Sequence, residues 1–133
     1  MSLGPPLHPD EIVYRRIAAR SADDAQWIDE NCRVDANAFR PNSGDADGLS
    51  LTRASSPEVA AAGGRLGKEY YIVAIRVGDL INVPVCEDSP THALIPNMTY
   101  NARKTDAVRE AMEQLSQKCS VVSGPYPGTV DVE

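Results

Sequence analysis

The chain has 133 residues, of which 42% are hydrophobic and 24% charged, and its formal net charge is −6 at pH 7. This length fits one domain with a sizeable core, and the acidic balance argues against broad nucleic-acid binding, which needs a basic footprint. No apolar run approaches the roughly 18–20 residues that span a bilayer, and the first residues lack the pattern of a signal peptide, so we expect a cytoplasmic protein without a membrane partner.

The first quarter of the chain predicts an extended lead-in, a strand and a short helix. Residues 1–10 are rich in proline and should be extended, and residues 12–17 read as a short strand whose two faces are mixed. One arginine of this strand, Arg15 or Arg16, either points at a pocket or lies exposed over the sheet. Residues 21–24 resemble a capping box, which predicts a helix from about Asp23 to Asn31 with Trp27 as a packing anchor.

The next stretch predicts a loop followed by a strand. Residues 33–39 should be extended, and residues 43–48 form a polar, glycine-rich loop. Asp45 and Asp47 resemble the start of a calcium loop, but the position for its bidentate glutamate holds Ser56, so we interpret both aspartates as turn residues. Residues 48–53 alternate, with Leu49 and Leu51 toward the core.

The middle of the chain gives the clearest local signals. Ser56, Pro57 and Glu58 combine an N-cap, a proline at the first helical position and an acid in the first turn, which predicts a helix to about residue 62 that ends at Gly63 and Gly64. Residues 70–77 then predict a strand that is apolar on both faces and therefore central in the sheet.

The last third predicts one long helix between short strands. Residues 82–90 look irregular because they contain Pro84 and Pro90, and residues 91–95 read as a short strand. Residues 105–119 form the best helix, with one apolar face; residues 120–123 form a final strand closed by the turn 124–128, and residues 129–133 should fray. Together these elements predict an α+β fold, a single domain over residues 1–133 with a mixed or mostly antiparallel sheet and about three helices. We expect the helices mainly on one side, with a sheet covered on both faces as the alternative.

Metal and cofactor signals are missing from the sequence. Cys32, Cys86 and Cys119 are far apart, neither they nor His8 and His92 form close pairs, and no phosphate-binding glycine loop is present. The sequence thus predicts no metal site and no cofactor, and the sparse cysteines fit a reducing compartment.

A few side chains could bind a ligand. His92 could act as a general base near neutral pH, or its ring could be hydrogen-bonded to a nearby loop. A pair of Cys86 with His92 is a conceivable nucleophile and base. A local basic patch could also form from Arg15, Arg16, Arg20, Arg40, Arg53 and Arg103. Our candidate ligand-binding residues are Arg16, Arg40, Ser50, Thr52 and His92, and no catalytic residue is assigned.

Two resemblances accompany these candidates. The segments 14–16 (YRR), 38–41 (AFRP), 48–50 (GLS), 56–58 (SPE) and 90–93 (PTHA) are similar to a pattern in a family of small bacterial proteins, and that resemblance implies a coherent domain without a named activity. Arg15 or Arg16 followed by Ser50 and Thr52 also resembles the arginine–serine–glutamate class of ADP-ribosyltransferases. The Glu/Gln-x-Glu motif of that class is absent after the Ser-x-Thr strand, so the resemblance supplies no catalytic glutamate.

Three hypotheses follow. The first is a non-enzymatic binding or accessory domain for a protein partner or a small anionic ligand. The second is a small nucleotide-using transferase, for which Arg16, Ser50 and His92 should meet in one pocket. The third is a structural subunit that forms a homo-oligomer through an edge strand or through the helix 105–119.

Overall fold

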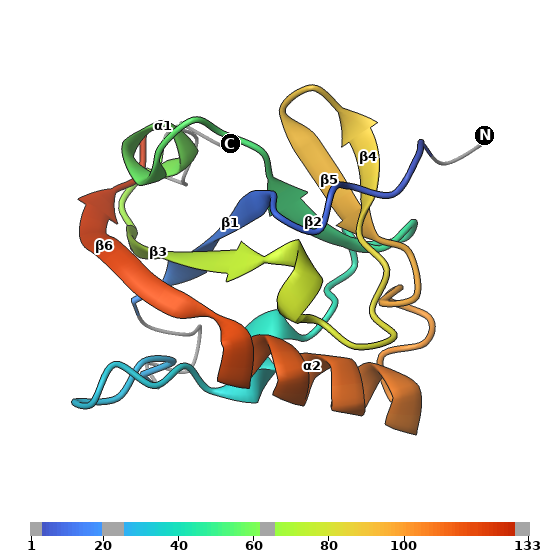
Figure 1. The fold of residues 1–133 in the computed structure, drawn as a ribbon. Coiled ribbons are helices and arrows are strands. Elements are labelled where there is room, and N and C mark those ends of the chain that lie inside the picture. Colours follow the sequence, from blue (N-terminus) through green and yellow to red (C-terminus); the bar gives the residue numbers. More distant parts are fainter. Residues whose placement is uncertain (1–3, 20–25, 62–65, 130–133) are drawn as a thin grey trace.

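A six-stranded sheet, antiparallel throughout, organises the protein (Figure 1). The computed structural model describes residues 4–19, 26–61 and 66–129. The strand order is β4-β5-β2-β1-β3-β6. The strands are β1 Ile12–Ala18, β2 Leu49–Thr52, β3 Glu69–Arg76, β4 Cys86–Ser89, β5 His92–Ile95 and β6 Ser120–Pro127. The helices are α1 Pro57–Ala61 and α2 Asp106–Lys118, with 3-10 turns η1 Ala36–Phe39 and η2 Val77–Asp79. The predicted α+β class is confirmed.

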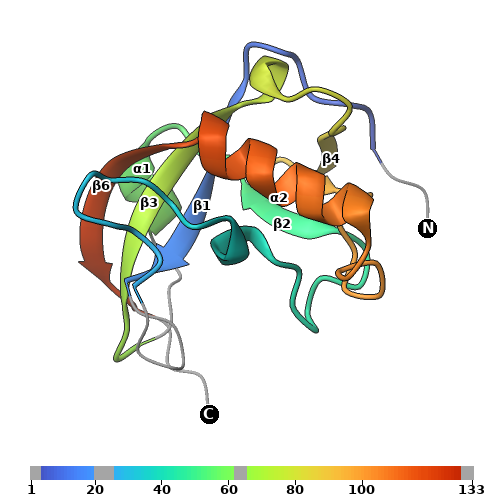
Figure 2. The same cartoon turned by 90° about the horizontal axis from the view of Figure 1, so that it is seen from below.

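Strand β3 is buried on both faces, as its sequence predicts, but it lies beside the edge strand β6 and not at the centre of the sheet. Val73 and Ile75 are fully buried in the main core, which α2 also lines. Ile72 points the other way and packs against Ala60 and Ala61 of α1. Figure 1 shows α1 and α2 on opposite sides of the sheet, and Figure 2 shows η1 beside α2. Helices therefore cover both faces, which was the alternative arrangement, because β3 has an apolar face to cover on each side.

Helix α2 follows its sequence signals closely. The hydroxyl oxygen of Thr105 accepts a hydrogen bond from the N–H of Val108 and so caps the first turn. The apolar stripe then packs onto the sheet through four buried residues, Val108, Ala111, Met112 and Leu115. None of the helices in the described part of the chain has the length and hydropathy needed to cross a membrane.

Gln114 joins α2 to the loop after η2. Its side-chain oxygen accepts the N–H of Ile81 at 2.8 Å, and its side-chain nitrogen donates to the C=O of Ile81 at 2.8 Å. Each such bond contributes about 1 kcal/mol net, so we expect Gln114→Ala to lower the free energy of unfolding by about 1–2 kcal/mol. Amide hydrogen exchange should also speed up at Ile81. Unchanged exchange at Ile81 would show that the pair contributes nothing to loop stability.

The thiol of Cys119, at the C-terminal end of α2, makes the stability of the protein depend on pH. The thiol is half-buried at the C-cap, and burial raises its pKa to about 11. An unfolded thiol titrates near pH 8.5. Between these values the unfolded chain has lost the proton that the folded protein retains, so stability falls as pH rises.

We therefore expect Cys119→Ala to reduce the loss of stability between pH 8 and pH 10.5 by about 1–2 kcal/mol, measured by urea unfolding at both values. The matched control is Cys32→Ala, which removes an exposed thiol. An equal effect of the two substitutions would contradict the burial argument.

The predicted helix from Asp23 to Asn31 is wrong over its described part. Residues 26–31 form no helix, and Ile28 instead pairs with Val34 in an isolated bridge. The cause is Asp29, whose carboxylate accepts the N–H groups of Asn31 and Arg33 and so closes a turn. Cys32 is exposed in this turn, whereas Trp27 does pack against the core, as predicted. Three predictions lie outside the described residues: the helix cap at residues 21–24, the helix end at residues 62–64 and the frayed tail at residues 130–133.

Three further local predictions need correction. Residues 36–39 form η1 rather than an extended segment, because the Asp35 carboxylate caps the N–H of Asn37. Residues 86–89 form β4, since Pro84 and Pro90 flank this strand without interrupting it. Strand β6 also continues through the expected turn to Pro127.

The part of the N-terminal lead-in at residues 4–7 lies along the outer edge of β4, whereas residues 9–10 form a turn. The N–H of Leu7 donates to the C=O of Val85 at 2.9 Å, and the N–H of Glu87 donates to the C=O of Pro5 at 2.9 Å. Gly4 approaches Glu87 so closely that a Cβ would lie 2.5 Å from its carbonyl oxygen. This edge is thus already paired within the chain.

Candidate functional site

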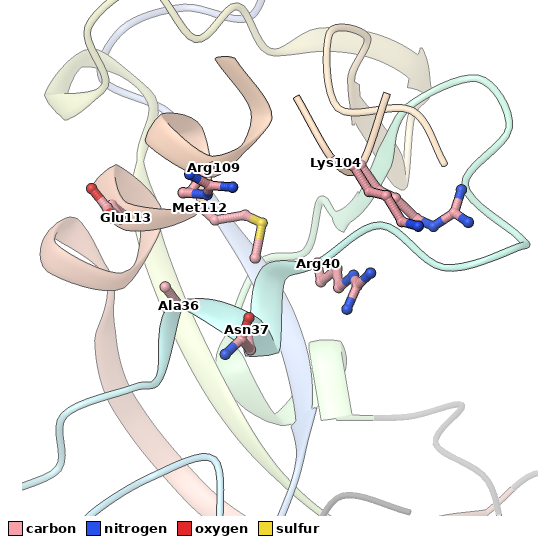
Figure 3. Close-up of a pocket in the computed structure, with 8 residues that line it drawn as sticks. Ala36, Asn37, Arg40, Lys104, Arg109, Met112 and Glu113 are labelled. Atoms are coloured by element: carbon pink, nitrogen blue, oxygen red, sulfur yellow. The ribbon is translucent and has the colours of Figure 1, made fainter. Parts of the chain in front are cut away.

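A cavity of about 520 Å³ lies on the α2 side of the sheet, between η1 and the start of α2 (Figure 3). Its lining combines four cations and one carboxylate with a small polar and apolar remainder. The lining residues are Ala36, Asn37, Arg40, Arg103, Lys104, Arg109, Met112 and Glu113. The cavity is therefore strongly cationic although the whole chain carries a net charge of −6.

The side of the cavity formed by η1 is held in place by the core of the protein. Phe39 is fully buried and anchors η1 in the main core. The N–H of Arg40 donates to the C=O of Asn37 and ends the 3-10 turn. Asn37 and Arg40 consequently remain exposed at the cavity while their backbone is held in place.

The loop after Arg40 connects to the loop before α2. The carboxylate of Asp45 accepts the N–H of Asn42, and the C=O of Asp45 accepts the N–H of Tyr100 at 2.9 Å. Asp45 is thus a buried turn residue, as predicted. Its bond to Tyr100 brings the segment that carries Arg103 and Lys104 next to Arg40, although more than 60 residues separate them in sequence.

Arg103 is held in a defined orientation. Its guanidinium lies 3.8 Å from the centre of the Tyr100 ring, and Nη1 donates to the C=O of Tyr100 at 2.8 Å. A guanidinium carries five N–H donors, so the group keeps further donors after these contacts. Stacking on an aromatic ring reduces the rotamer freedom that binding would otherwise remove.

The cations differ in how far the protein neutralises them. Arg109 lies 3.4 Å from the carboxylate of Asp106. Within the ranges that the structure describes, Arg40 and Lys104 have no hydrogen-bonding or acidic partner for their side chains. These two groups are therefore the ones most available to an anion.

Helix α2 adds to the positive potential. The first turn of a helix carries a partial positive charge that favours acids and disfavours cations. Arg103 and Lys104 nevertheless precede the cap Thr105, and Asp106 is the only acid of the first turn. This charge arrangement opposes helix stability, which is typical of residues kept for a site rather than for folding.

The predicted ligand-binding residues separate into two groups. Arg40 lies in the cavity, whereas Ser50 and Thr52 alternate with the core-facing Leu49 and Leu51 and so face away from α2. His92 shares that opposite face, since it is the register partner of Thr52.

On that face the side chains have local partners. Arg16 donates to the C=O of Ala60 in α1 at 3.0 Å. The Nδ1 of His92 lies 2.6 Å from the carboxylate of Asp88. Neither residue, nor Ser50 or Thr52, lines any of the three cavities described for residues 4–19, 26–61 and 66–129.

The remaining arginines of the expected basic patch are structural. Arg53, which follows β2, forms two bonds with Glu11, at 2.8 and 3.0 Å, and one with Glu87 of β4 at 2.9 Å, and so joins the start of β1 to β4. Arg15 points into the core and donates to the C=O of Ser50 at 2.8 Å. Arg20 lies outside the described residues, and of the five described arginines the cavity gathers Arg40 and Arg103.

Sequence reasoning missed Lys104, Arg109 and Met112 as site residues. A signal was present, because two consecutive cations stand directly before the N-cap of the best helix and a third follows in its first turn. Met112 belongs to the apolar face predicted for residues 105–119, but the cavity that reaches it depends on η1.

Among the described residues, no group of three or more histidine, cysteine or acidic side chains is arranged to hold a metal ion. Comparison of the chain with family models, curated proteins and solved structures found no match.

Proposed function

We propose that this protein is a binding domain for a small anionic ligand, which it holds in the cavity between η1 and α2. The observation that carries the proposal is the concave cationic lining, in which Arg40 and Lys104 lack acidic partners among the described residues. An anion there would accept charge-assisted hydrogen bonds from guanidinium and ammonium groups. The volume of about 520 Å³ is within the range of small-molecule sites.

The geometry favours this function over the other hypotheses. A concave cavity suits a small ligand better than it suits a protein partner. The lining contains no serine, threonine, cysteine or histidine, the side chains of a nucleophile paired with a base. The transferase alternative requires Arg16, Ser50 and His92 in one pocket, and none of them lines a described cavity. We therefore propose binding rather than catalysis.

The test is the affinity for inorganic phosphate, followed by ¹H–¹⁵N NMR at low salt. Charged hydrogen bonds contribute about 1.5–3 kcal/mol each, so the double substitution Arg40→Gln with Lys104→Gln should weaken binding about 100-fold or more. Binding should also weaken as sodium chloride is added, since salt screens exposed charges. Wild-type resonances around the cavity that do not move with phosphate would refute the proposal.

The matched control is Lys68→Gln, which removes an exposed lysine that does not line the cavity. This control should bind phosphate as the wild type does.

Lys104→Gln alone offers a second readout. It removes a cation from the positive end of α2, so we expect the free energy of unfolding to rise by about 0.5 kcal/mol while phosphate affinity falls about tenfold. Opposite changes in stability and affinity identify a residue retained for binding. A loss of both would indicate a structural role for Lys104 instead.

A further inference from the structure

The cavity is much larger than a single phosphate or carboxylate requires. Its volume of about 520 Å³ leaves room for a ligand body attached to the anionic group. The lining next to the cations determines which kind of body fits there.

Two apolar side chains, Met112 and Ala36, belong to that lining, and Met112 is 6% exposed. Figure 3 shows the thioether of Met112 directed toward the space between Ala36 and Arg40, with Lys104 above Arg40 in this view. The backbone of Met112 is fixed on the buried face of α2. A methionine thioether adapts to flat apolar groups and makes favourable contacts with aromatic rings.

The cations cluster to one side of this apolar surface. In Figure 3 Arg40 and Lys104 lie to the same side of Met112, and Arg109 leaves α2 on the other side of Met112. Arg103 directly precedes Lys104 in the sequence, and Arg109 is partly neutralised by Asp106. A ligand that satisfies both regions carries its negative group at one end and apolar surface next to it.

We infer that the ligand class is an anion with an apolar, planar body, such as an aryl phosphate or an aromatic acid, whose ring packs on Met112 and Ala36 while Arg40, Arg103 and Lys104 hold the anionic group. The inference rests on the proposed function, because it names the kind of anion that this same cavity selects. Burial of a phenyl ring against apolar side chains should strengthen binding at least tenfold over the bare anion.

The experiment uses the protein with ¹³C-labelled methionine methyl groups. It compares titrations with inorganic phosphate, phenyl phosphate and ribose 5-phosphate. We expect phenyl phosphate to bind at least tenfold more tightly than the other two. It should shift the Met112 methyl resonance by ring current, while the resonance of Met98, which is fully buried and does not line this cavity, stays in place.

Two results would overturn the inference and leave the proposed function intact: equal affinity for all three probes, or tighter binding of ribose 5-phosphate, in either case without movement of the Met112 methyl. Failure of all three probes to bind would overturn the inference and the proposed function together. The charge variant Arg40→Gln should weaken all three probes by a similar factor, since it removes a contact to the shared anionic group. An effect of Arg40→Gln on phenyl phosphate alone would contradict the assigned orientation.

Discussion

Replacing Phe39 by alanine should lower the free energy of unfolding by about 3–5 kcal/mol. Phe39 is fully buried, and it anchors η1 in the core that α2 and the sheet share. Alanine would leave a void that the closely packed surroundings cannot fill. Total stabilities are typically about 5–15 kcal/mol, so this single change could remove a large part of the margin. Urea unfolding followed by circular dichroism measures it.

The same substitution links the core to the cavity. Arg40 is the next residue in the chain, and its position depends on η1. We therefore expect Phe39→Ala to weaken phosphate binding even where the protein remains folded. The control is Val59→Ala in α1, whose side chain is 56% exposed, so its cost should stay within about 0.5 kcal/mol. A similar cost for both substitutions would show that η1 is not anchored by Phe39.

Replacing Arg15 by methionine should cost about 2–4 kcal/mol. Methionine keeps most of the aliphatic length of arginine but cannot donate to the C=O of Ser50. That bond joins β1 to β2, two strands that share a single register pair. Burial lowers the pKa of the Arg15 guanidinium, and the carboxylate of Asp45 opposes that shift. An arginine remains charged at neutral pH, so the substitution also deprives the buried Asp45 of a compensating charge.

A double-mutant cycle isolates the electrostatic part. Asp45→Asn keeps an oxygen acceptor for the N–H of Asn42 and removes the charge. If the two charges stabilise each other, Arg15→Met should cost about 1 kcal/mol less in the Asp45→Asn background than in the wild type. Equal costs in both backgrounds would mean that the Ser50 bond and packing account for the whole effect. The Nε of Arg15 is enclosed without a partner, which limits how much the group can contribute.

Strong local patterns predicted the main elements of the fold. The β-branched run of β3, the alternation in β2 and the capped apolar stripe of α2 each point to one structure, and each was confirmed. The wrong predictions occur where a hydrogen bond from a single polar side chain determines the local backbone conformation. The Asp29 carboxylate accepts a backbone N–H and closes a turn where a helix was predicted. The Asp35 carboxylate accepts the N–H of Asn37 and starts η1 where an extended segment was predicted.

The candidate site was predicted only in part, because it is assembled by tertiary contacts. Arg40 could be selected as a ligand-binding residue from sequence, but its neighbours could not. They come from the loop before α2, which the bond between Tyr100 and Asp45 brings into place. The pattern of apolar and polar residues along a chain predicts local elements, and it does not predict a hydrogen bond between two loops that are far apart in the sequence.

The pairing of the lead-in with β4 also determines how copies of this chain can meet. At one rim of the sheet, the backbone groups of β4 are occupied by residues 4–7. At the other rim, Pro125 and Pro127 lack the N–H groups that an incoming strand would need. Pairing of a further strand is thus hindered where residues 4–7 cover β4 and where these two prolines lie in β6.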